Sequence, residues 1–352
     1  MENCVERYTP FVPRERSTLK DVARKAGVSF GLAGRVLGNY GSFSEETRRK
    51  VIRAARLVRY TPNTIARSLR TRLTRTVGVL IADITSYFWS SLARGLQDRA
   101  ARDGFSLILC NSDEESTSEK AYLANLVERS VDGLVISPTI GNHAYLRRLA
   151  AERLPLVLVD RRIRGLAVPA VRVDNREGAY EAVRHLISLG HERIGILKGI
   201  DGVETSDERL AGYEQALTES RIRIRPALAK EGRFLKDQAF RATQELLAMR
   251  SGPTAIFACN EPMLTGCLLA LKEAGVRIPH DMALIGFDDP VWAPCADPPL
   301  TAVSQPAYAM GMLAFDLLAA QIGSPASSRR PAEEVVLKPN LIIRESCGGS
   351  KA

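Results

Sequence analysis

TLKDVARKAGVSFGLAGRVLGNYGSFSEETRRKVIRAARLVRYTPNTIARSLRT, residues 18–71, is the stretch that decides how this chain is organised. Thr18, Ser29 and Ser44 each precede a segment with helical spacing of apolar residues, and hydroxyl side chains are favoured N-caps. Asp21 stands where a capping-box partner for Thr18 is expected. Two short helices joined by a glycine turn, followed by a basic third helix, predict a helix-turn-helix whose second helix would enter the major groove of DNA.

The formal net charge of +9 is not spread evenly along the chain. Residues 1–75 contain 17 Lys and Arg against six Asp and Glu, a net charge of +11, whereas residues 76–352 carry −2. A nucleic-acid-binding protein concentrates cations where phosphates must be met. The alternative interpretation, a small helical cap with no role in DNA binding, does not account for this concentration.

Other compositional features limit the possible functions. A length of 352 residues favours more than one domain. The six cysteines include no CxxC pair, which indicates reduced thiols in a cytosolic protein, and the four histidines show no metal-ligand spacing. No apolar run is long enough to span a membrane, and residues 1–16 lack the apolar segment of a secretion signal. We therefore expect a cytoplasmic protein with a disordered N-terminal arm and without a cofactor, a metal or a membrane contact.

From Thr76 onward, short apolar runs alternate with segments of helical spacing. The runs are TVGVLIAD, FSLILCN, GLVISP, PLVLVD, AVRVDN, RIGILKG, AIFACN, MALIGFDD, LTAVSQP and EEVVLKPNLIIRE. Continuous apolar strands between amphipathic helices predict an α/β fold with doubly wound parallel sheets, covered by helices on both faces. About eight such units exceed one ordinary sheet, so we expect two lobes.

Polar and aromatic side chains follow several of these runs. Ligands of open parallel sheets bind beyond the carboxyl ends of the strands. The residues found there are Asp83 to Trp89, Asp160-Arg161, Asp174-Asn175, Asn260-Glu261 and Asp288-Asp289. Carboxylates, amides, a guanidinium and aromatic faces together suit a hydroxyl-rich ligand. Each group also has a structural interpretation: strand-end Asp and Asn often cap the next helix, which we favour for Asp174, and Phe88 and Trp89 could be core.

Motifs along most of the chain resemble one family. They are TLKDVARKAGVS, SEETRRKVIRAARLVRYTPNTIARSLRT, TVGVLIADIT, VDGLVISP, LVLVDR, VRVDN, LGHERIGIL, ERLAGYEQAL, ALIGFDD and PPLTAVSQP. In this order, from about Thr18 to Glu345, they resemble the lactose/galactose repressor family of bacterial transcription regulators.

The resemblance implies a DNA-binding head, a hinge helix and an effector domain similar to periplasmic sugar-binding proteins, in which the chain crosses between two lobes three times. The implied segments are an arm at 1–16, the helix-turn-helix head at 17–61, the hinge helix and linker at 62–75, the effector domain at 76–346 and a tail at 347–352. We place the first lobe at about 76–174 and 304–334, and the second at about 175–303 and 335–346.

The same resemblance implies a set of DNA-contacting residues: Thr18, Ser29, Phe30, Gly31 and Arg35 in the head, and Asn63, Arg67 and Leu69 in the hinge helix. Leu69 matches a leucine wedge that enters the minor groove, in a helix that folds when two copies pair on operator DNA. The second helix departs from the family pattern, because Gly31 has no side chain to read a base. Phe30 could still contact a thymine methyl, and Arg35 a guanine or a phosphate. We therefore expect the hinge and DNA shape to supply more of the specificity than usual.

For the effector, the resemblance implies a binding set from both lobes: Phe88, Trp89, Asp160, Arg161, Arg209, Phe234, Asn260, Asp288 and Gln305. Two departures alter the expected cleft: Ser86-Tyr87 replaces the usual Asn-Pro, and Asn260-Glu261 replaces the usual Asn-Asp. A sugar or sugar derivative is the expected ligand, while a nucleoside or a small acid stays possible.

The expected function is that of a homodimeric repressor whose affinity for double-stranded operator DNA is controlled by this ligand. We expect release from DNA on binding, with co-repression as the alternative. The residues after Glu345 contain no heptads for a further helix bundle, which favours dimers over tetramers.

Two other classes of protein share part of this pattern. A transporter's solute-binding protein would share the two lobes, but it should have a secretion signal and lack the basic head. A nucleotide-dependent enzyme is the second alternative. GILKGIDG at 195–202 fits neither GxGxxG nor the phosphate-loop pattern, and Asp288-Asp289 is a weak signal for acid–base catalysis.

Overall fold

The computed structural model describes residues 17–61, 73–323 and 333–348. The chain divides into two compact units, Met1–Thr74 and Arg75–Ala352. The expected N-terminal arm and the hinge-helix residues Asn63, Arg67 and Leu69 lie outside the described residues. Within the described ranges, no helix is long and apolar enough to cross a lipid bilayer.

The described part of the first unit contains three helices, α1 (Leu19–Ala26), α2 (Phe30–Leu37) and α3 (Glu45–Leu57). Their N-caps are the expected hydroxyl residues: Thr18 forms a reciprocal capping box with Asp21, and the Ser29 and Ser44 side chains each accept a backbone N–H from the first turn that follows. The helices enclose a small core that is fully buried at its centre, formed by Val22, Ala23, Ala33, Val36, Val51, Ala54 and Ala55. The local sequence signals therefore predicted the three described helices and their caps correctly.

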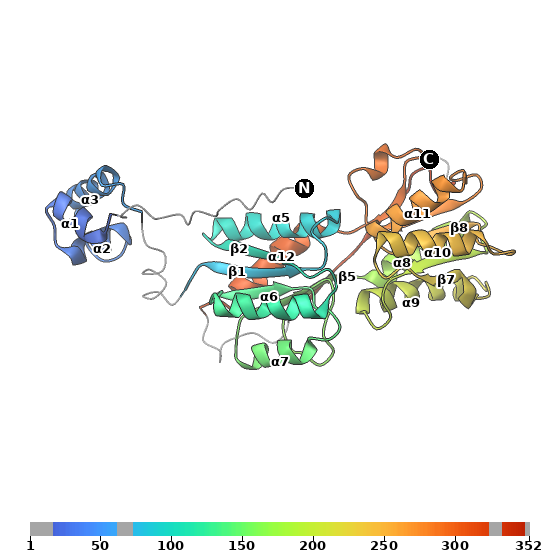
Figure 1. Cartoon of the computed structure of the whole chain (residues 1–352), viewed down its shortest axis with the longest axis horizontal. Helices are drawn as coiled ribbons and strands as arrows, with labels where there is room; N and C mark the ends of the chain where they lie inside the picture. The colour runs from blue at the N-terminus through green and yellow to red at the C-terminus, as the bar shows by residue number, and fades with distance from the viewer. Residues whose placement is uncertain (1–16, 62–72, 324–332, 349–352) are drawn as a thin grey trace, which may run out of the picture. The chain divides into compact units, whose positions relative to one another are not determined.

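One lobe of the second unit is built on a six-stranded parallel sheet of order β11-β5-β4-β3-β1-β2. Its strands are β1 (Thr76–Ile81), β2 (Ser106–Asn111), β3 (Gly133–Ile136), β4 (Leu156–Val159), β5 (Ala170–Val173) and β11 (Glu334–Leu337). Its helices are α5 (Tyr87–Arg102), α6 (Ser116–Glu128), α7 (His143–Ala151) and α12 (Ala307–Ala319). Helices α5 and α12 cover one face of the sheet, and α6 and α7 cover the other (Figure 1).

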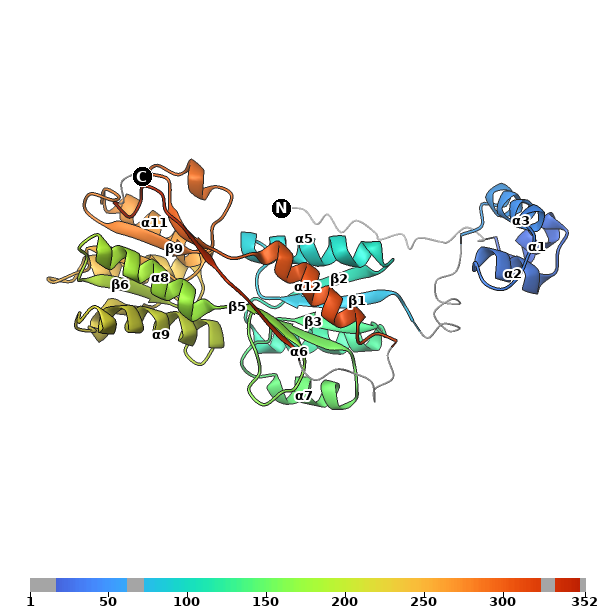
Figure 2. The same ribbon diagram turned by 180° about the vertical axis from the view of Figure 1, so that it is seen from behind.

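The other lobe repeats this plan with a sheet of order β12-β10-β9-β8-β6-β7, in which only the β10–β12 pair is antiparallel. Its strands are β6 (Ile194–Lys198), β7 (Ala229–Glu231), β8 (Ala255–Ala258), β9 (Ala283–Phe287), β10 (Thr301–Ser304) and β12 (Asn340–Ile342). Its helices are α8 (Asn175–Ser188), α9 (Glu204–Glu219), α10 (Lys236–Leu247) and α11 (Glu261–Glu273), with 3-10 turns at Pro226–Leu228 and Ala293–Cys295. Helices α8 and α9 lie on one face and α10 and α11 on the other (Figures 1 and 2).

The chain passes between the lobes after β5, after β10 and between β11 and β12, and Figure 2 shows the red C-terminal segment making the third crossing. The expected boundary at 334/335 was wrong, because all of β11 pairs with β5 in the first sheet. The crossing falls at Lys338-Pro339 instead. The sequence EEVVLKPNLIIRE gives no sign of this crossing, because its two strands, one in each lobe, have the same apolar character.

The expected start of a tail at residue 347 was also wrong. Cys347 is fully buried in the core of the second lobe, and its sulfur accepts a hydrogen bond from Thr301 Oγ1 at 3.1 Å. Ser346 is buried beside it and accepts the Thr301 backbone N–H. A short polar sequence at the end of a chain gives no local sign of such long-range packing.

Candidate functional site

The exposed face of α2 carries few side chains that could contact a base. Ser29, Phe30, Gly31 and Arg35 are all exposed, and Phe30 is 55% exposed. A Cβ added to Gly31 would meet no atom within 4 Å, so no packing inside the head requires a glycine at this position. The hydroxyls of Thr18 and Ser29 already serve the caps of α1 and α2. Phe30 and Arg35 are therefore the side chains of this face that remain free for DNA.

Helix α3 adds positive charge to the same unit. Arg48 and Lys50 form surface ion pairs with Glu45 and Glu46, at 3.4 and 2.7 Å. Arg49, Arg53 and Arg56 are exposed and have no ion pair in the described part of the chain. Unpaired exposed guanidiniums of this kind suit contacts with phosphates.

A cavity lies between the two lobes of the second unit, at the carboxyl ends of their strands. All nine residues expected to bind the effector line it: Phe88, Trp89, Asp160, Arg161, Arg209, Phe234, Asn260, Asp288 and Gln305. Its other lining residues are Ala82, Asp83, Ser86, Asp113, Glu114, Thr205, Leu235 and Pro262. We call this cavity the central pocket. This cavity lies where the strand-end rule predicts a ligand site.

The aromatic wall of the central pocket begins α5. The rings of Phe88 and Trp89 meet edge to face, with centroids 4.8 Å apart. Both side chains also belong to the apolar core under the first sheet. Phe88 and Trp89 are therefore both core residues and part of the pocket wall.

Arg161 is the most heavily paired cation of the pocket. Its guanidinium donates to both Glu114 carboxylate oxygens at 2.9 and 2.8 Å, and its Nε donates to Asp160 at 3.1 Å. Burial lowers the pKa of Arg161, but these two carboxylates outweigh it and raise the pKa above the ordinary value. Sequence reasoning missed Glu114, because nothing in the sequence indicates a pairing across 47 residues.

Arg209 projects from α9 into the other side of the pocket. Its Nε donates to Asn175 Oδ1 at 2.8 Å, a second N–H donates to the Cys259 carbonyl, and the guanidinium lies 3.8 Å from the Phe287 ring centroid. These contacts fix its orientation. Asp174, for which we favoured a capping role, accepts the Glu177 N–H at 3.0 Å and caps α8.

Asp160 and Asp288 occupy equivalent positions after β4 and β9. Both have left-handed backbones, with φ of 68° and 78°, a conformation that Asp tolerates better than most residues and that turns each carboxylate sharply out of its strand. Burial raises the pKa of both, against the opposing effect of nearby arginines. Asp288 accepts from Gln305 Nε2 at 2.6 Å, which leaves Gln305 Oε1 buried without a hydrogen-bond partner in the described residues.

Asn260 and Glu261 stand at the start of α11. Asn260 Oδ1 caps the helix by accepting the Met263 N–H, so it combines a structural role with its place in the pocket wall. Glu261 reaches into the other lobe, where one carboxylate oxygen accepts the Tyr87 N–H at 2.7 Å and the Ser86 hydroxyl at 3.0 Å. Helix α5 has no cap from its own N-cap side chain, so Glu261 supplies one from the opposite lobe.

The two departures from the family pattern therefore meet in one contact. A proline at position 87 would have no N–H to donate to Glu261. Tyr87 supplies that donor, and the longer Glu261 carboxylate receives it. This contact joins the lobes beside the central pocket.

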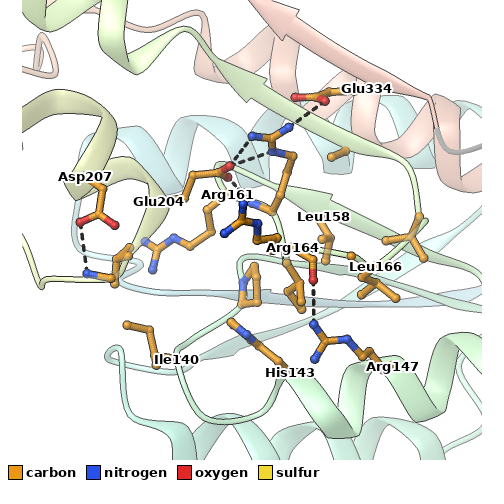
Figure 3. Close-up of a pocket in the computed structure, with 18 of the residues that line it drawn as sticks. Ile140, His143, Arg147, Leu158, Arg161, Arg164, Leu166, Glu204, Asp207 and Glu334 are labelled. Carbon is orange, nitrogen blue, oxygen red and sulfur yellow. Dashed lines mark hydrogen bonds and ion pairs between the residues drawn. The ribbon is translucent and has the colours of Figure 1, made fainter. Parts of the chain in front are cut away.

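Ion pairs join the lobes on the other side of the pocket. Arg162 of the first lobe binds Glu204 of α9 through its side chain at 2.5 and 2.8 Å, and it also contacts Glu334 at 3.0 Å. Arg172 binds Glu208 at 3.1 Å. Figure 3 shows Glu204 and Glu334 among the residues around this junction. Contacts on both sides thus hold the lobes together.

Acidic side chains outnumber basic ones around the central pocket. Five carboxylates line it, from Asp83, Asp113, Glu114, Asp160 and Asp288, against the guanidiniums of Arg161 and Arg209. Across the described ranges, no group of three His, Cys, Asp or Glu side chains could hold a metal ion. The polar groups and aromatic faces of its lining suit the binding of a polar molecule.

Comparison with known proteins agrees with this architecture. Residues 18–63 match the model for bacterial regulatory proteins of the lacI family, and residues 183–347 match the periplasmic binding protein-like domain. The HTH-type transcriptional repressor PurR of Photobacterium profundum is 34% identical over 94% of this chain and 98% of its own length.

Several solved structures are similar over nearly the whole chain, and two of them serve as examples. The lac repressor dimer bound to operator and the anti-inducer ONPF is 27% identical, with a TM-score of 0.82 over 95% of this chain and 99% of that one. The transcriptional regulator CelR in complex with cellobiose is 29% identical, with a TM-score of 0.71 over 94% of this chain and 100% of that one. Together, the fold, the head and these relatives show that the chain belongs to the lacI family of bacterial regulatory proteins and is a DNA-binding transcriptional regulator, not an enzyme.

Proposed function

We propose that the protein is a homodimeric transcriptional repressor of the bacterial cytoplasm, released from its operator when a neutral, hydroxyl-rich molecule, a sugar or sugar derivative, binds in the central pocket. The observation that carries this proposal is the convergence of all nine expected effector residues on one cavity between the lobes. A ligand held by both lobes can change the angle between them, and a regulator needs such a change.

The charge of the central pocket supports a neutral ligand. Five carboxylates line it against two guanidiniums, although only Asp160 and Asp288 among the five are buried, so an anionic ligand would meet more negative than positive side chains at close range. Asp160 and Asp288 can accept hydrogen bonds from hydroxyl groups, and the free Gln305 oxygen needs a donor of the same kind. Aromatic faces beside these groups suit the C–H face of a sugar ring, and the similar regulator CelR was solved with cellobiose. A small acid is therefore disfavoured.

The size of the central pocket supports a link between binding and movement. The space open to a small molecule is about 90 Å³, whereas pockets for small ligands generally measure about 300–1,000 Å³. We infer that a ligand of that size favours an arrangement with the lobes further apart, in which contacts such as Glu261–Tyr87 or Arg162–Glu204 would be longer. The ligand favours the wider arrangement only by its differential affinity for it.

On the DNA side, we propose that Phe30 and Arg35 make the main base contacts and that Thr18, Ser29 and Gly31 lie against the backbone. The hinge residues Asn63, Arg67 and Leu69 would contact the centre of the operator. A recognition helix with so few free side chains leaves more of the specificity to DNA shape. Swapping bases at the operator centre should therefore weaken binding at least as much as swapping them in the half-sites.

The first test measures the thermal unfolding of the full chain against a panel of neutral sugars, sugar acids and nucleosides. A true effector at about 100 times its dissociation constant should stabilise the protein by about 2.7 kcal/mol. The same molecule should weaken operator binding in a mobility-shift assay. Tighter DNA binding would identify a co-repressor, and stabilisation by sugar acids alone would contradict the neutral ligand.

A deletion of residues 1–72 provides the matched control. It should abolish salt-dependent retention on DNA and leave the thermal response to the effector intact. Retention of DNA binding by this variant would contradict the role of the head.

A further inference from the structure

We propose that a second cavity between the lobes, distinct from the central pocket, binds a phosphorylated, hydroxyl-bearing metabolite. This outer pocket is bounded by the β4–β5 loop (residues 161–168), by His143 and Arg147 of α7, and by the first turn of α9 (residues 203–208) (Figure 3). Its volume of about 820 Å³ lies within the range of small-molecule sites. Arg161 lines both pockets.

Two of the arginines in the outer pocket are already neutralised. Arg161 is held by Glu114 and Asp160, and Arg162 is held by Glu204 and Glu334. Neither guanidinium needs an added anion. Both instead form the boundary between the lobes.

Arg147 and Arg164 are different. Arg147 donates to the backbone carbonyl of Arg164 at 2.7 Å, which joins α7 to the β4–β5 loop (Figure 3). Neither guanidinium has a carboxylate partner within the described ranges. Burial and the nearby Arg147 lower the pKa of His143, so its ring stays neutral at physiological pH and adds a hydrogen-bonding group without charge. This wall therefore presents two unneutralised cations from adjoining segments.

A phosphate monoester matches this wall. Its charge of about −1.5 to −2 at neutral pH corresponds to two guanidiniums, and planar guanidinium forks bind phosphate oxygens in pairs. The opposite wall carries the carboxylates of Glu204 and Asp207, of which Asp207 also accepts the Gly202 N–H at 3.1 Å. Acceptors on that side favour hydroxyl groups on the rest of the ligand. A phosphorylated sugar combines both features.

Because the outer pocket touches both lobes, an occupant that fits one angle between them better than another favours that angle. The central pocket depends on the same angle, so the two ligands should change each other's affinity by an equal factor. The regulator would then respond to a neutral molecule and to a phosphorylated one. The existence of the outer site does not depend on the identity of the central ligand.

The test uses the full-length protein and glucose 6-phosphate as the probe, with glucose and inorganic phosphate as comparisons. Isothermal titration should detect binding of glucose 6-phosphate, and R147A/R164A should weaken it at least tenfold. Arg148→Ala is the matched control, because Arg148 is exposed on the same helix, pairs with Glu152 at 3.6 Å and does not line the pocket. It should bind the probe like the unmodified protein.

Asp288→Asn separates the two sites, because Asp288 lines only the central pocket. Its affinity for glucose 6-phosphate should be unchanged, even if no sugar binds the central pocket in any variant. The outer site would be overturned if the unmodified protein did not bind glucose 6-phosphate up to about 10 mM, or if R147A/R164A bound it as tightly as the unmodified protein. It would also be overturned if Arg148→Ala lost as much affinity as R147A/R164A, or if Asp288→Asn was the only variant to lose affinity. If the probe bound the cationic head instead, R147A/R164A would bind it as tightly as the unmodified protein. Circular dichroism checks that each variant is folded.

Discussion

The rest of the protein holds two sets of residues in place very differently. One set is the candidate DNA-contacting residues of α2, and the other is the candidate effector residues of the central pocket. Ser29, Phe30 and Arg35 come from two turns of one helix and are exposed. The pocket residues come from strand ends and helices of two lobes, and most are buried with two or more fixed contacts. A helix face can thus be altered at little cost to folding, whereas a change in the pocket affects stability and binding together. The following substitutions test this difference.

The largest effect is expected at Arg161. Arg161→Ala would leave the buried Asp160 carboxylate and Glu114 without their cation, and breaking a buried pair costs about 3–5 kcal/mol. The neighbouring Arg162→Ala is the control, because Arg162 is 40% exposed and its pairs are accessible to water. That change should cost less than about 1 kcal/mol. Urea denaturation measures both, and equal costs would contradict the distinction between buried and exposed pairs.

In the head, a substitution should change DNA binding rather than stability. Arg35→Ala should leave the thermal stability nearly unchanged but weaken operator binding by about 1–3 kcal/mol if Arg35 contacts a guanine. A phosphate contact would instead weaken binding equally on operator and unrelated DNA. Arg184→Ala, at an exposed position of α8, is the control and should bind DNA normally. Fluorescence anisotropy on both DNAs separates the cases. Unchanged affinity on both would exclude Arg35 from the interface.

Glu261 tests the contact between the lobes. Glu261→Ala removes the carboxylate that caps α5 from the opposite lobe, and the loss of a helix cap costs about 0.5–2 kcal/mol. The lobes should also separate more readily, which small-angle scattering would detect as a larger radius of gyration when residues 1–72 are deleted. Glu273→Ala, at the exposed end of the same helix, is the control. If scattering did not change, other contacts would hold the lobes together.

A feature could be predicted from the sequence when the residues that form it lie close together along the chain. The caps at Thr18, Ser29 and Ser44 act within three residues, so all three were predicted. The pocket position followed from the strand-end rule, and its residues followed from the family resemblance. The role of Glu261 was not predictable, because its partners Ser86 and Tyr87 are about 175 residues away in the other lobe. Strand β7 was also missed, because its three residues, AKE, have no apolar pattern.

Glu119 provides a pH-dependent test in the buried part of the molecule. Its side chain is fully buried, one oxygen accepts the Thr139 N–H at 2.7 Å, and the other has no partner among the described residues. Burial raises the pKa of Glu119 despite the hydrogen bonds that oppose it. The folded state therefore binds its proton more tightly than the unfolded state, and stability falls as the pH rises through the raised pKa.

Glu119→Gln removes this ionisation and supplies an N–H that can satisfy a buried acceptor. The variant should be more stable than the unmodified protein at pH 8 by about 1 kcal/mol, the value of one hydrogen bond. The difference should shrink below pH 4.5, the ordinary pKa of glutamate. Urea denaturation at several pH values measures it, and a constant difference would show that Glu119 does not titrate in this range.

The smallest effect is expected at Gly31. Alanine is more favourable than glycine in a helix interior by about 1 kcal/mol, Gly31 is the second residue of α2, and a Cβ there meets no atom within 4 Å, so Gly31→Ala should stabilise the head by less than about 1 kcal/mol. Gly27→Ala is the control, since Gly27 has a φ of 66° and alanine is strained there. A stabilised head that binds the operator less tightly would indicate that DNA approaches Gly31 too closely for a methyl group. Unchanged binding would indicate that this part of α2 stays clear of the bases, which leaves Phe30 and Arg35 as its contacts in the major groove.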